Sequence, residues 1–194
     1  MAGIKKLYRG IHWRNIAVEF ISIVAGVLIA LAVDEWNEDR QNQNRATNAI
    51  ENVSSELQEN LKILNIIHPN NVAVMSALFD STEGDANQNF LPGVQLQETA
   101  WQTMINTGVS AYIPYDDLYE IGAIYKMIEI YKRSGNQVMD SFTESRGLFL
   151  ALDKTLADVE IFVANRAGLE VMMYLETSLL EELPKYLEKH PEGE

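Results

Sequence analysis

The sequence contains no cysteine, and it has only three histidines among its 194 residues. The absence of cysteine excludes disulfides, thiolate metal sites, iron–sulfur clusters and cysteine nucleophiles. Basic residues are also scarce, since 15 Lys and Arg stand against 28 Asp and Glu, which gives a formal net charge of -13. A chain of this charge lacks the basic surface that nucleic-acid binding requires, so no DNA or RNA partner is expected.

The histidines and carboxylates form no recognisable chemical motif. His12, His68 and His190 lie far apart in the sequence, and none has the HxxxH, HExxH or Glu-x-x-His spacing of metal sites. The signatures GxGxxG, GxxxxGK[ST] and GxSxG are also missing. We interpret the carboxylates as an acidic surface and the histidines as solvated or capping residues. The sequence therefore predicts a non-enzymatic protein with no catalytic residue, no metal site and no cofactor.

A long apolar run near the N-terminus contrasts with this polar composition. Residues 16–33 contain one charge, Glu19, and a helix of this length spans roughly 27 Å, close to the hydrocarbon thickness of a membrane. Basic residues precede the run and acidic residues follow it. Because cytoplasmic flanks carry an excess of Lys and Arg, we predict a transmembrane helix in a bacterial inner membrane. Its N-terminus is then cytoplasmic, and residues 34–194 are periplasmic.

Two other interpretations of residues 16–33 remain open. A cleaved signal peptide would use Ala30-Leu31-Ala32 as its processing site, and a soluble protein could bury the run as a core helix. The length of the run and the opposite charges at its two ends favour a retained membrane anchor.

One face of this predicted helix carries small residues together with its single carboxylate. Steps of three and four residues place on that face Glu19, Ser22, Gly26, Ala30 and Val33. Small side chains let another transmembrane helix approach closely, and a carboxylate inside a membrane marks a functional site. A single span offers no second ionisable group for a proton relay, so we predict that Glu19 fixes helix association. The expected partners are the lipid bilayer and other transmembrane helices, from a second copy or from a larger complex.

Aromatic side chains flank the apolar run, as they do at membrane–water interfaces. The predicted interface anchors are Tyr8, Trp13 and Trp36. The polar residues that follow the run predict a helical stalk. The predicted organisation is a cytoplasmic stub, a transmembrane helix, a juxtamembrane stalk and an acidic helical bundle, over residues 1–15, 16–33, 34–48 and 49–194 respectively.

The junction after the apolar run is similar to that of a known group of proteins. It reads GVLIAL at 26–31 and WNEDR at 36–40. A second similar block consists of Trp101, Met104, Thr107-Gly108, Leu118 and Tyr125. These motifs, with the early Glu19, resemble an uncharacterised family of bacterial single-pass membrane proteins over roughly residues 16–135. The sequence departs from the family at Val33-Asp34-Glu35, where Ile-Asn-Asn is more usual. The resemblance supports a single-pass topology and implies no activity.

Helical periodicity continues beyond the junction, and no alternating strand pattern is found. An apolar stripe at helical spacing consists of Ala46, Ile50, Val53, Leu57, Leu61 and Leu64. Pro69 is expected to end or kink this helix near Ile67. A shorter helix over 71–79 and a loop over 81–93 should follow.

Capping residues predict the next two helices. Thr99 with Gln102 should cap a helix that ends at Gly108 in a left-handed conformation. A box of Asp117 and Glu120 should open the following helix.

Glycine and proline predict the remaining helix ends. The second capped helix should stop near Ser134, closed by Gly135. Gly168 should divide the apolar pattern of residues 137–183, and Pro184 should end or bend it. The predicted fold class is all-α, with a single N-terminal transmembrane helix continuing into an extramembrane bundle of five or six helices.

Aromatic residues gather in the middle of the chain. The cluster comprises Trp101, Tyr112, Tyr115, Tyr119, Tyr125 and Tyr131. The first four predict a partner or ligand patch, because Trp and Tyr are enriched where proteins bind partners and ligands. The stronger interpretation is packing within the bundle, with tyrosine hydroxyls reaching water. Met172 and Met173 are predicted to lie in the core.

These features predict an accessory or scaffolding subunit of an inner-membrane complex, of the respiratory or photosynthetic kind. The alternative is an extracytoplasmic bundle that senses a ligand and signals through a partner, since the cytoplasmic stub is too short for an output domain. A periplasmic enzyme of unrecognised type is the third interpretation. A pocket lined by Trp101 and several tyrosines would favour the sensor, whereas a closed bundle without a polar pocket would count against both rivals.

Overall fold

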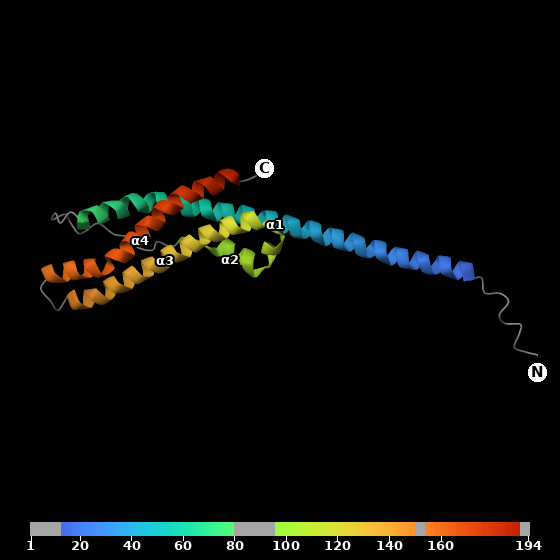
Figure 1. Ribbon diagram of the computed structural model, residues 1–194, viewed down its shortest axis with the longest axis horizontal. Helices are drawn as coiled ribbons and strands as arrows, with labels where there is room; N and C mark the ends of the chain where they lie inside the picture. The colour runs from blue at the N-terminus through green and yellow to red at the C-terminus, as the bar shows by residue number, and fades with distance from the viewer. Residues whose placement is uncertain (1–12, 80–95, 150–153, 191–194) are drawn as a thin grey trace, which may run out of the picture. The chain divides into compact units, whose positions relative to one another are not determined.

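The computed structural model describes residues 13–79, 96–149 and 154–190, and within these ranges every regular element is helical (Figure 1). The elements are α1 (Trp13–Phe79), α2 (Thr99–Asn106), a short 3₁₀ helix η1 (Val109–Tyr112), α3 (Tyr115–Phe149) and α4 (Lys154–Lys189). The predicted all-α class, with an apolar N-terminal helix followed by a helical bundle, is confirmed. The described residues form four α-helices and the short η1, where five or six bundle helices were expected.

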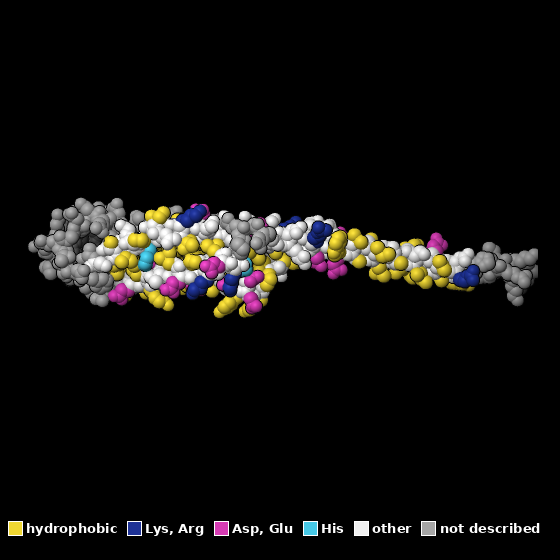
Figure 2. Space-filling view, turned by 90° about the horizontal axis from the view of Figure 1, so that it is seen from above, with side chains coloured by type: hydrophobic (Ala, Val, Ile, Leu, Met, Phe, Trp, Pro, Cys, Tyr) yellow, Lys and Arg dark blue, Asp and Glu magenta, His cyan; other side chains and the backbone are white. Residues whose placement is uncertain are grey.

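The chain divides into two compact units, one ending at Asn44 and one beginning at Arg45. The described part of the first unit is the beginning of α1, which is long and apolar enough to span a membrane, with a mean hydropathy of 2.7 and no buried residue in its apolar window. Figure 2 shows that hydrophobic side chains cover most of this part of the helix. Within the first unit, no described residue covers that apolar surface.

The second unit is a bundle whose core lies between α1 from Arg45 onward, α3 and α4. The helices α3 and α4 run side by side in opposite directions (Figure 1). Fully buried apolar side chains recur at helical spacing on each of the three helices: Val53, Leu57 and Leu64 on α1, Ile121 and Ile128 on α3, and Met172, Leu179 and Leu183 on α4. The predicted burial of Met172 is confirmed, and Met173 packs against the same core.

Pro69 was expected to end or kink the helix, and it does not end it, because α1 continues through this proline to Phe79. Pro69 removes a backbone N–H that would bond the carbonyl of Asn65, and both residues are exposed, so water can satisfy that carbonyl. On both sides of the proline the buried Leu64, Ile67 and Met75 pack into the core. This packing outweighs the local cost of the proline. The predicted loop over 81–93 lies outside the described residues.

The two predicted capping pairs are also wrong. The N-cap of α2 is Glu98, without a side-chain cap, and Thr99 is already helical. The helix α3 begins at Tyr115, directly after Pro114, so Asp117 lies inside its first turn. The prediction for Gly108 is confirmed, because this residue follows the C-cap of α2 with a φ of 72°.

Neither Gly135 nor Gly168 interrupts its helix, contrary to the prediction. Gly135 is buried inside α3, and Gly168 lies within α4. A Cβ atom at Gly168 would lie 2.8 Å from the Cγ2 atom of Val138 on α3. Gly168 therefore allows α3 and α4 to approach each other. Pro184 is likewise inside α4, which continues because the following Tyr186 is buried in the core.

Candidate functional site

Every residue of the predicted transmembrane packing face is exposed within the first unit. Its members are Glu19, Ser22, Gly26, Ala30 and Val33. The Ser22 hydroxyl donates a hydrogen bond to the Val18 carbonyl at 2.9 Å, which satisfies it within its own helix. Nothing lies within 4 Å of the position that a Cβ atom of Gly26 would take. This face is therefore open to contact from outside the first unit.

Two of the three predicted interface anchors lie in the described part of the chain. Trp13 is 77% exposed and Trp36 is 63% exposed, and the Arg40 guanidinium lies over the Trp36 ring at 5.9 Å from its centroid. Tyr8 lies outside the described residues. Exposed indole rings at both ends of the apolar run are compatible with the predicted interfacial role.

The predicted aromatic patch separates into a half-buried part and an exposed part. Trp101 stacks on Tyr125, with ring centroids 5.2 Å apart and an interplanar angle of 10°. Tyr115 and Tyr119 stack on each other at 6.2 Å and are 75% and 68% exposed, and Tyr112 is 48% exposed. The packing interpretation therefore describes Trp101, whereas the three exposed tyrosines keep the position expected of a partner patch.

A buried carboxylate on α1 holds the beginning of α2. Glu56 accepts the backbone N–H of Ala100 at 2.8 Å and the hydroxyl of Tyr125 at 2.6 Å. One turn further along α1, Asn60 accepts the N–H of Gln97 at 2.7 Å and donates to its carbonyl at 2.8 Å. Because the free N–H groups at a helix start attract negative charge, Glu56 supplies from α1 the cap that α2 lacks locally.

A second buried carboxylate joins all three helices of the bundle. Glu176 on α4 is fully buried, and its Oε1 atom accepts Asn71 of α1 at 2.7 Å and the Tyr131 hydroxyl of α3 at 3.0 Å. Its Oε2 atom lies 2.9 Å from Nδ1 of His68, also on α1. Such a carboxylate is stable away from water only because several donors converge on it.

The tyrosines that contact these carboxylates differ from the expected packing in one respect. Their hydroxyls reach carboxylate oxygens inside the bundle and not water. Burial raises the pKa of the Tyr125 hydroxyl, and the hydrogen bond to Glu56 raises it further. Burial is also the largest cause that raises the pKa of Tyr131, and the negative charge of Glu176 is the second. Both tyrosines therefore remain protonated donors.

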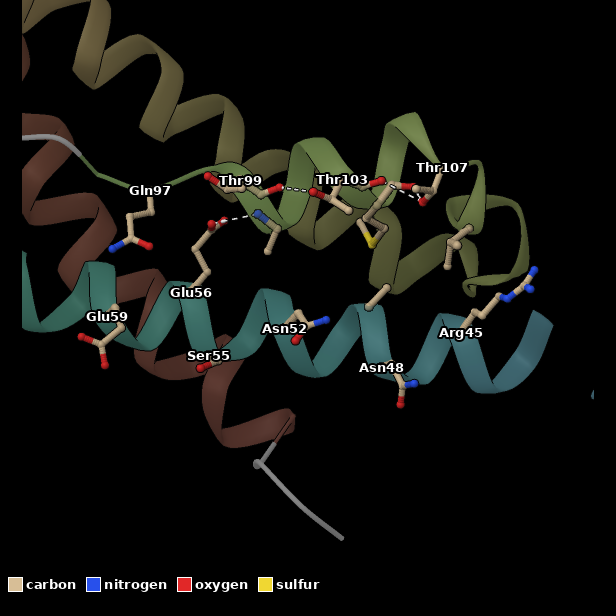
Figure 3. Close-up of a pocket in the computed structure, with 14 residues that line it drawn as sticks. Arg45, Asn48, Asn52, Ser55, Glu56, Glu59, Gln97, Thr99, Thr103 and Thr107 are labelled. Atoms are coloured by element: carbon tan, nitrogen blue, oxygen red, sulfur yellow. Dashed lines mark hydrogen bonds between the residues drawn. The ribbon is translucent and has the colours of Figure 1, made fainter. Parts of the chain in front are cut away.

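A groove with a volume of about 800 Å³ lies between α1 and α2 within the second unit. The apolar residues that line it are Ala49, Ala100, Met104 and Val109. Its α1 wall consists of Arg45, Asn48, Asn52, Ser55, Glu56 and Glu59, and its α2 wall of Gln97, Thr99, Thr103 and Thr107 (Figure 3). Among the described residues that line the groove none is aromatic, so the pocket of Trp101 and tyrosines expected for a sensor is not what this groove provides.

The groove has opposite charges at its two ends. Figure 3 places Arg45 and Thr107 at one end and Glu59 and Gln97 at the other, because α1 and α2 run in opposite directions. The Thr103 hydroxyl donates to the Thr99 carbonyl at 2.8 Å. Because its proton is used in this bond, the Thr103 hydroxyl can only accept a hydrogen bond from a group in the groove. Among residues 13–79, 96–149 and 154–190, no three His, Asp or Glu side chains are grouped closely enough to hold a metal ion.

The sequence carries a signal for the buried polar residues, which the prediction of an acidic surface does not use. Asn60 and Asn71 fall in step with the apolar residues of α1, and Glu176 falls in step with Met172 and Leu179 of α4. A polar residue at such a position predicts a buried hydrogen-bonded group. Interpreting all carboxylates as acidic surface was therefore wrong for Glu56 and Glu176, and His68 has a partner instead of being merely solvated.

Comparison of the chain with protein-family models, with curated proteins and with solved structures finds no match.

Proposed function

We propose that this chain is a non-catalytic, single-pass protein of a bacterial inner membrane that acts as an accessory or scaffolding subunit of a membrane complex. Its N-terminus is cytoplasmic, its bundle is periplasmic, and it docks through the face of Glu19, Gly26 and Ala30. Membership of the family with the GVLIAL and WNEDR junction is part of this proposal.

The observation that carries the proposal is the exposed apolar surface of residues 16–33. Phe20 is 66% exposed and Ile29 is 65% exposed, although both belong to an uninterrupted apolar helix. A contiguous apolar surface of this kind is stable in contact with lipid or with another helix, and not with water. The open position at Gly26 adds room for the close approach of a second helix.

The non-catalytic part of the proposal rests on how the buried acids are used. The oxygens of Glu56 and Glu176 accept hydrogen bonds from groups on other helices of the bundle. In this arrangement they connect helices, as structural polar networks do.

Docking is tested by purification of the full chain from its native membrane in mild detergent, followed by mass spectrometry of co-eluting proteins. We expect a defined complex, and we expect Gly26→Ile to release the partner because the added side chain separates the helices. Leu28→Ile, on the other side of the helix, is the matched control and should retain the partner. A chain that elutes only as a monomer, or a complex unaffected by Gly26→Ile, would contradict the docking proposal.

Topology has a separate test that exploits the absence of cysteine. Single substitutions Ala2→Cys and Glu188→Cys give each side of the membrane one thiol, which a membrane-impermeant maleimide can label in spheroplasts. We expect labelling at residue 188 without lysis and at residue 2 only after lysis. The opposite pattern would reverse the proposed orientation, and equal labelling of both would contradict a spanning anchor.

The second candidate function is a ligand-sensing bundle, and the groove between α1 and α2 is the observation in its favour. The groove is open and is lined by polar as well as apolar residues, so the bundle is not the closed one that would argue against a sensor. Its volume falls within the range of small-molecule sites, about 300–1,000 Å³. Retention of a small molecule by the purified bundle, without any protein partner, would favour this candidate over the scaffold.

A further inference from the structure

The dimensions of the groove suit an extended peptide. Its α1 wall runs from Arg45 to Glu59, which is about 21 Å along the helix axis at about 1.5 Å per residue. An extended chain rises about 3.3 Å per residue, so a segment of about six residues matches that length.

The chemistry of the walls also suits a peptide backbone. The amides of Asn48 and Asn52 on α1 can both donate and accept hydrogen bonds. On the α2 side of the groove, Thr99 and Thr103 offer hydroxyl oxygens as acceptors. A peptide main chain presents alternating N–H and C=O groups that need such partners. An acyl chain would leave these walls unpaired, and a polyphosphate would be repelled by the carboxylates of Glu56 and Glu59.

The charges at the two ends of the groove select the ends of the segment. Arg45 has an interaction of its own within the chain, but its guanidinium carries five N–H donors and can still bind an acidic side chain at one end. At the other end lie Glu56, which is buried and hydrogen-bonded, and Glu59, whose carboxylate forms an exposed pair with Lys62 at 2.6 Å. An exposed pair of this kind is weak and can exchange partners, so a basic side chain is favoured there.

We propose that the groove between α1 and α2 binds an extended segment, about six residues long, of a partner protein. The segment carries an acidic residue at the end near Arg45 and a basic residue at the end near Glu59, with small side chains above Ala49 and Ala100. This inference is independent of the transmembrane docking proposed above, because its residues all belong to the second unit.

The test uses the full chain in detergent and four pools of capped hexapeptides with four randomised central residues. The terminal residues are Glu and Lys, Lys and Glu, Glu and Glu, or Lys and Lys. We expect saturable binding from one of the two mixed-charge pools, about tenfold tighter than from either like-charge pool, measured by fluorescence anisotropy. Equal affinity for all four pools, or no saturable binding to any of them, would overturn the proposal.

Substitutions locate the binding in the groove. Thr103→Phe fills it and should abolish binding, whereas Gln102→Phe, on the same exposed helix but outside the groove, should leave it unchanged. Arg45→Glu should remove the preference for mixed-charge peptides. If Thr103→Phe lowers the melting temperature, Asn48→Phe on α1 is the second filling variant. Binding that survives both filling variants overturns the proposal, and Gly26→Ile should not affect it, which separates this test from that of membrane docking.

Discussion

The helix α1 presents apolar side chains in two opposite ways along its length. Between residues 16 and 33 they are exposed, with Val27 at 55% and Phe20 at 66%. Between residues 45 and 79 the apolar side chains on one face, such as Val53 and Leu57, are completely buried against the other helices of the bundle. The backbone is the same α-helix in both regions. The two regions differ in what covers them. Other helices of the bundle cover the apolar face of residues 45–79, whereas no described residue of the first unit covers residues 16–33.

The polar residues of the two regions differ in the same sense. In the first region the single carboxylate, Glu19, is exposed. In the second, Glu56, Asn60 and Asn71 are buried and each has a hydrogen-bond partner on another segment of the bundle. The bundle therefore contains its own partners, whereas the apolar region needs partners from outside.

The largest expected difference between the regions appears when the carboxylate of each is removed and the stability of the bundle is measured. Glu176→Leu should lower the free energy of unfolding of the bundle by roughly 3–5 kcal/mol, because His68, Asn71 and Tyr131 lose a buried partner. Glu19→Leu should leave that free energy unchanged. Thermal and denaturant unfolding in detergent measure both.

A third substitution separates shape from hydrogen bonding at Glu176. Glu176→Gln keeps the oxygen that accepts Asn71 and Tyr131, so it should retain more than half of the stability lost in Glu176→Leu. If the glutamine and leucine variants were equally destabilised, the negative charge itself would be the stabilising element.

A charge placed on an exposed apolar residue should distinguish a lipid-facing surface from a water-facing one. Leu28→Arg should cost roughly 2.5–3.5 kcal/mol of membrane insertion, because residue 28 lies near the middle of the apolar run. Ile66→Arg changes a residue that is 75% exposed in the bundle and should have no such cost. Membrane fractionation and carbonate extraction give the retained fraction. Equal retention of both variants would mean that the two exposed surfaces face the same solvent.

Alkaline pH should destabilise the bundle alone, since the described part of the first unit has no tyrosine. Burial raises the pKa of Tyr186 to about 12 from an ordinary 10.0, and Tyr125 and Tyr131 are raised too. A tyrosine ionises on losing its proton, so above pH 10 the unfolded chain binds fewer protons and stability falls as the pH rises towards 12. The share of Tyr186 is roughly 2–3 kcal/mol.

Unfolding curves between pH 9 and about pH 12 measure this loss, with phenolate absorbance as a second signal. Tyr186→Phe is the control and should reduce the pH dependence by the share of that residue. A bundle whose stability is flat across the range would show that these hydroxyls titrate normally.

The smallest expected effect on stability comes from a methyl group added at a glycine of each region, Gly168 in the bundle and Gly26 in the apolar region. Gly168→Ala should destabilise the bundle by about 1–2 kcal/mol, because the new methyl group would lie 2.8 Å from a methyl of Val138. Gly26→Ala adds a methyl group in open space and should not change bundle stability. The double variant Gly168→Ala with Val138→Ala should recover part of the loss, whereas no recovery would place the strain elsewhere.

The sequence predicted the features that depend on local periodicity. The apolar run, the buried Val53, Leu57 and Leu64, and the left-handed Gly108 all follow from spacing or from the conformation of one residue. Each of these signals lies within a few turns of helix, which is why they can be recognised without a structure.

The helices continue through Pro69, Gly135 and Gly168 for a common reason. Local signals place a break there, but residues beyond each position, such as Met75 and Val138, are buried against other helices. The groove could not be predicted either, since it depends on bonds between residues 37 and 44 positions apart in the sequence. Tertiary packing overrides local propensity where it buries enough side chains on both sides of a breaker.

The hydrogen bonds from Glu56 and Asn60 to the start of α2 affect whether this helix is stable. An eight-residue helix is too short to persist in water by itself. The helix α2 therefore depends on contacts with the rest of the bundle: Glu56 and Asn60 hold its beginning, and its Trp101 and Met104 pack in or against the core. A fragment containing α2 without α1 would be unstructured, and one wall of the groove can be removed by changing residues that lie on the opposite helix.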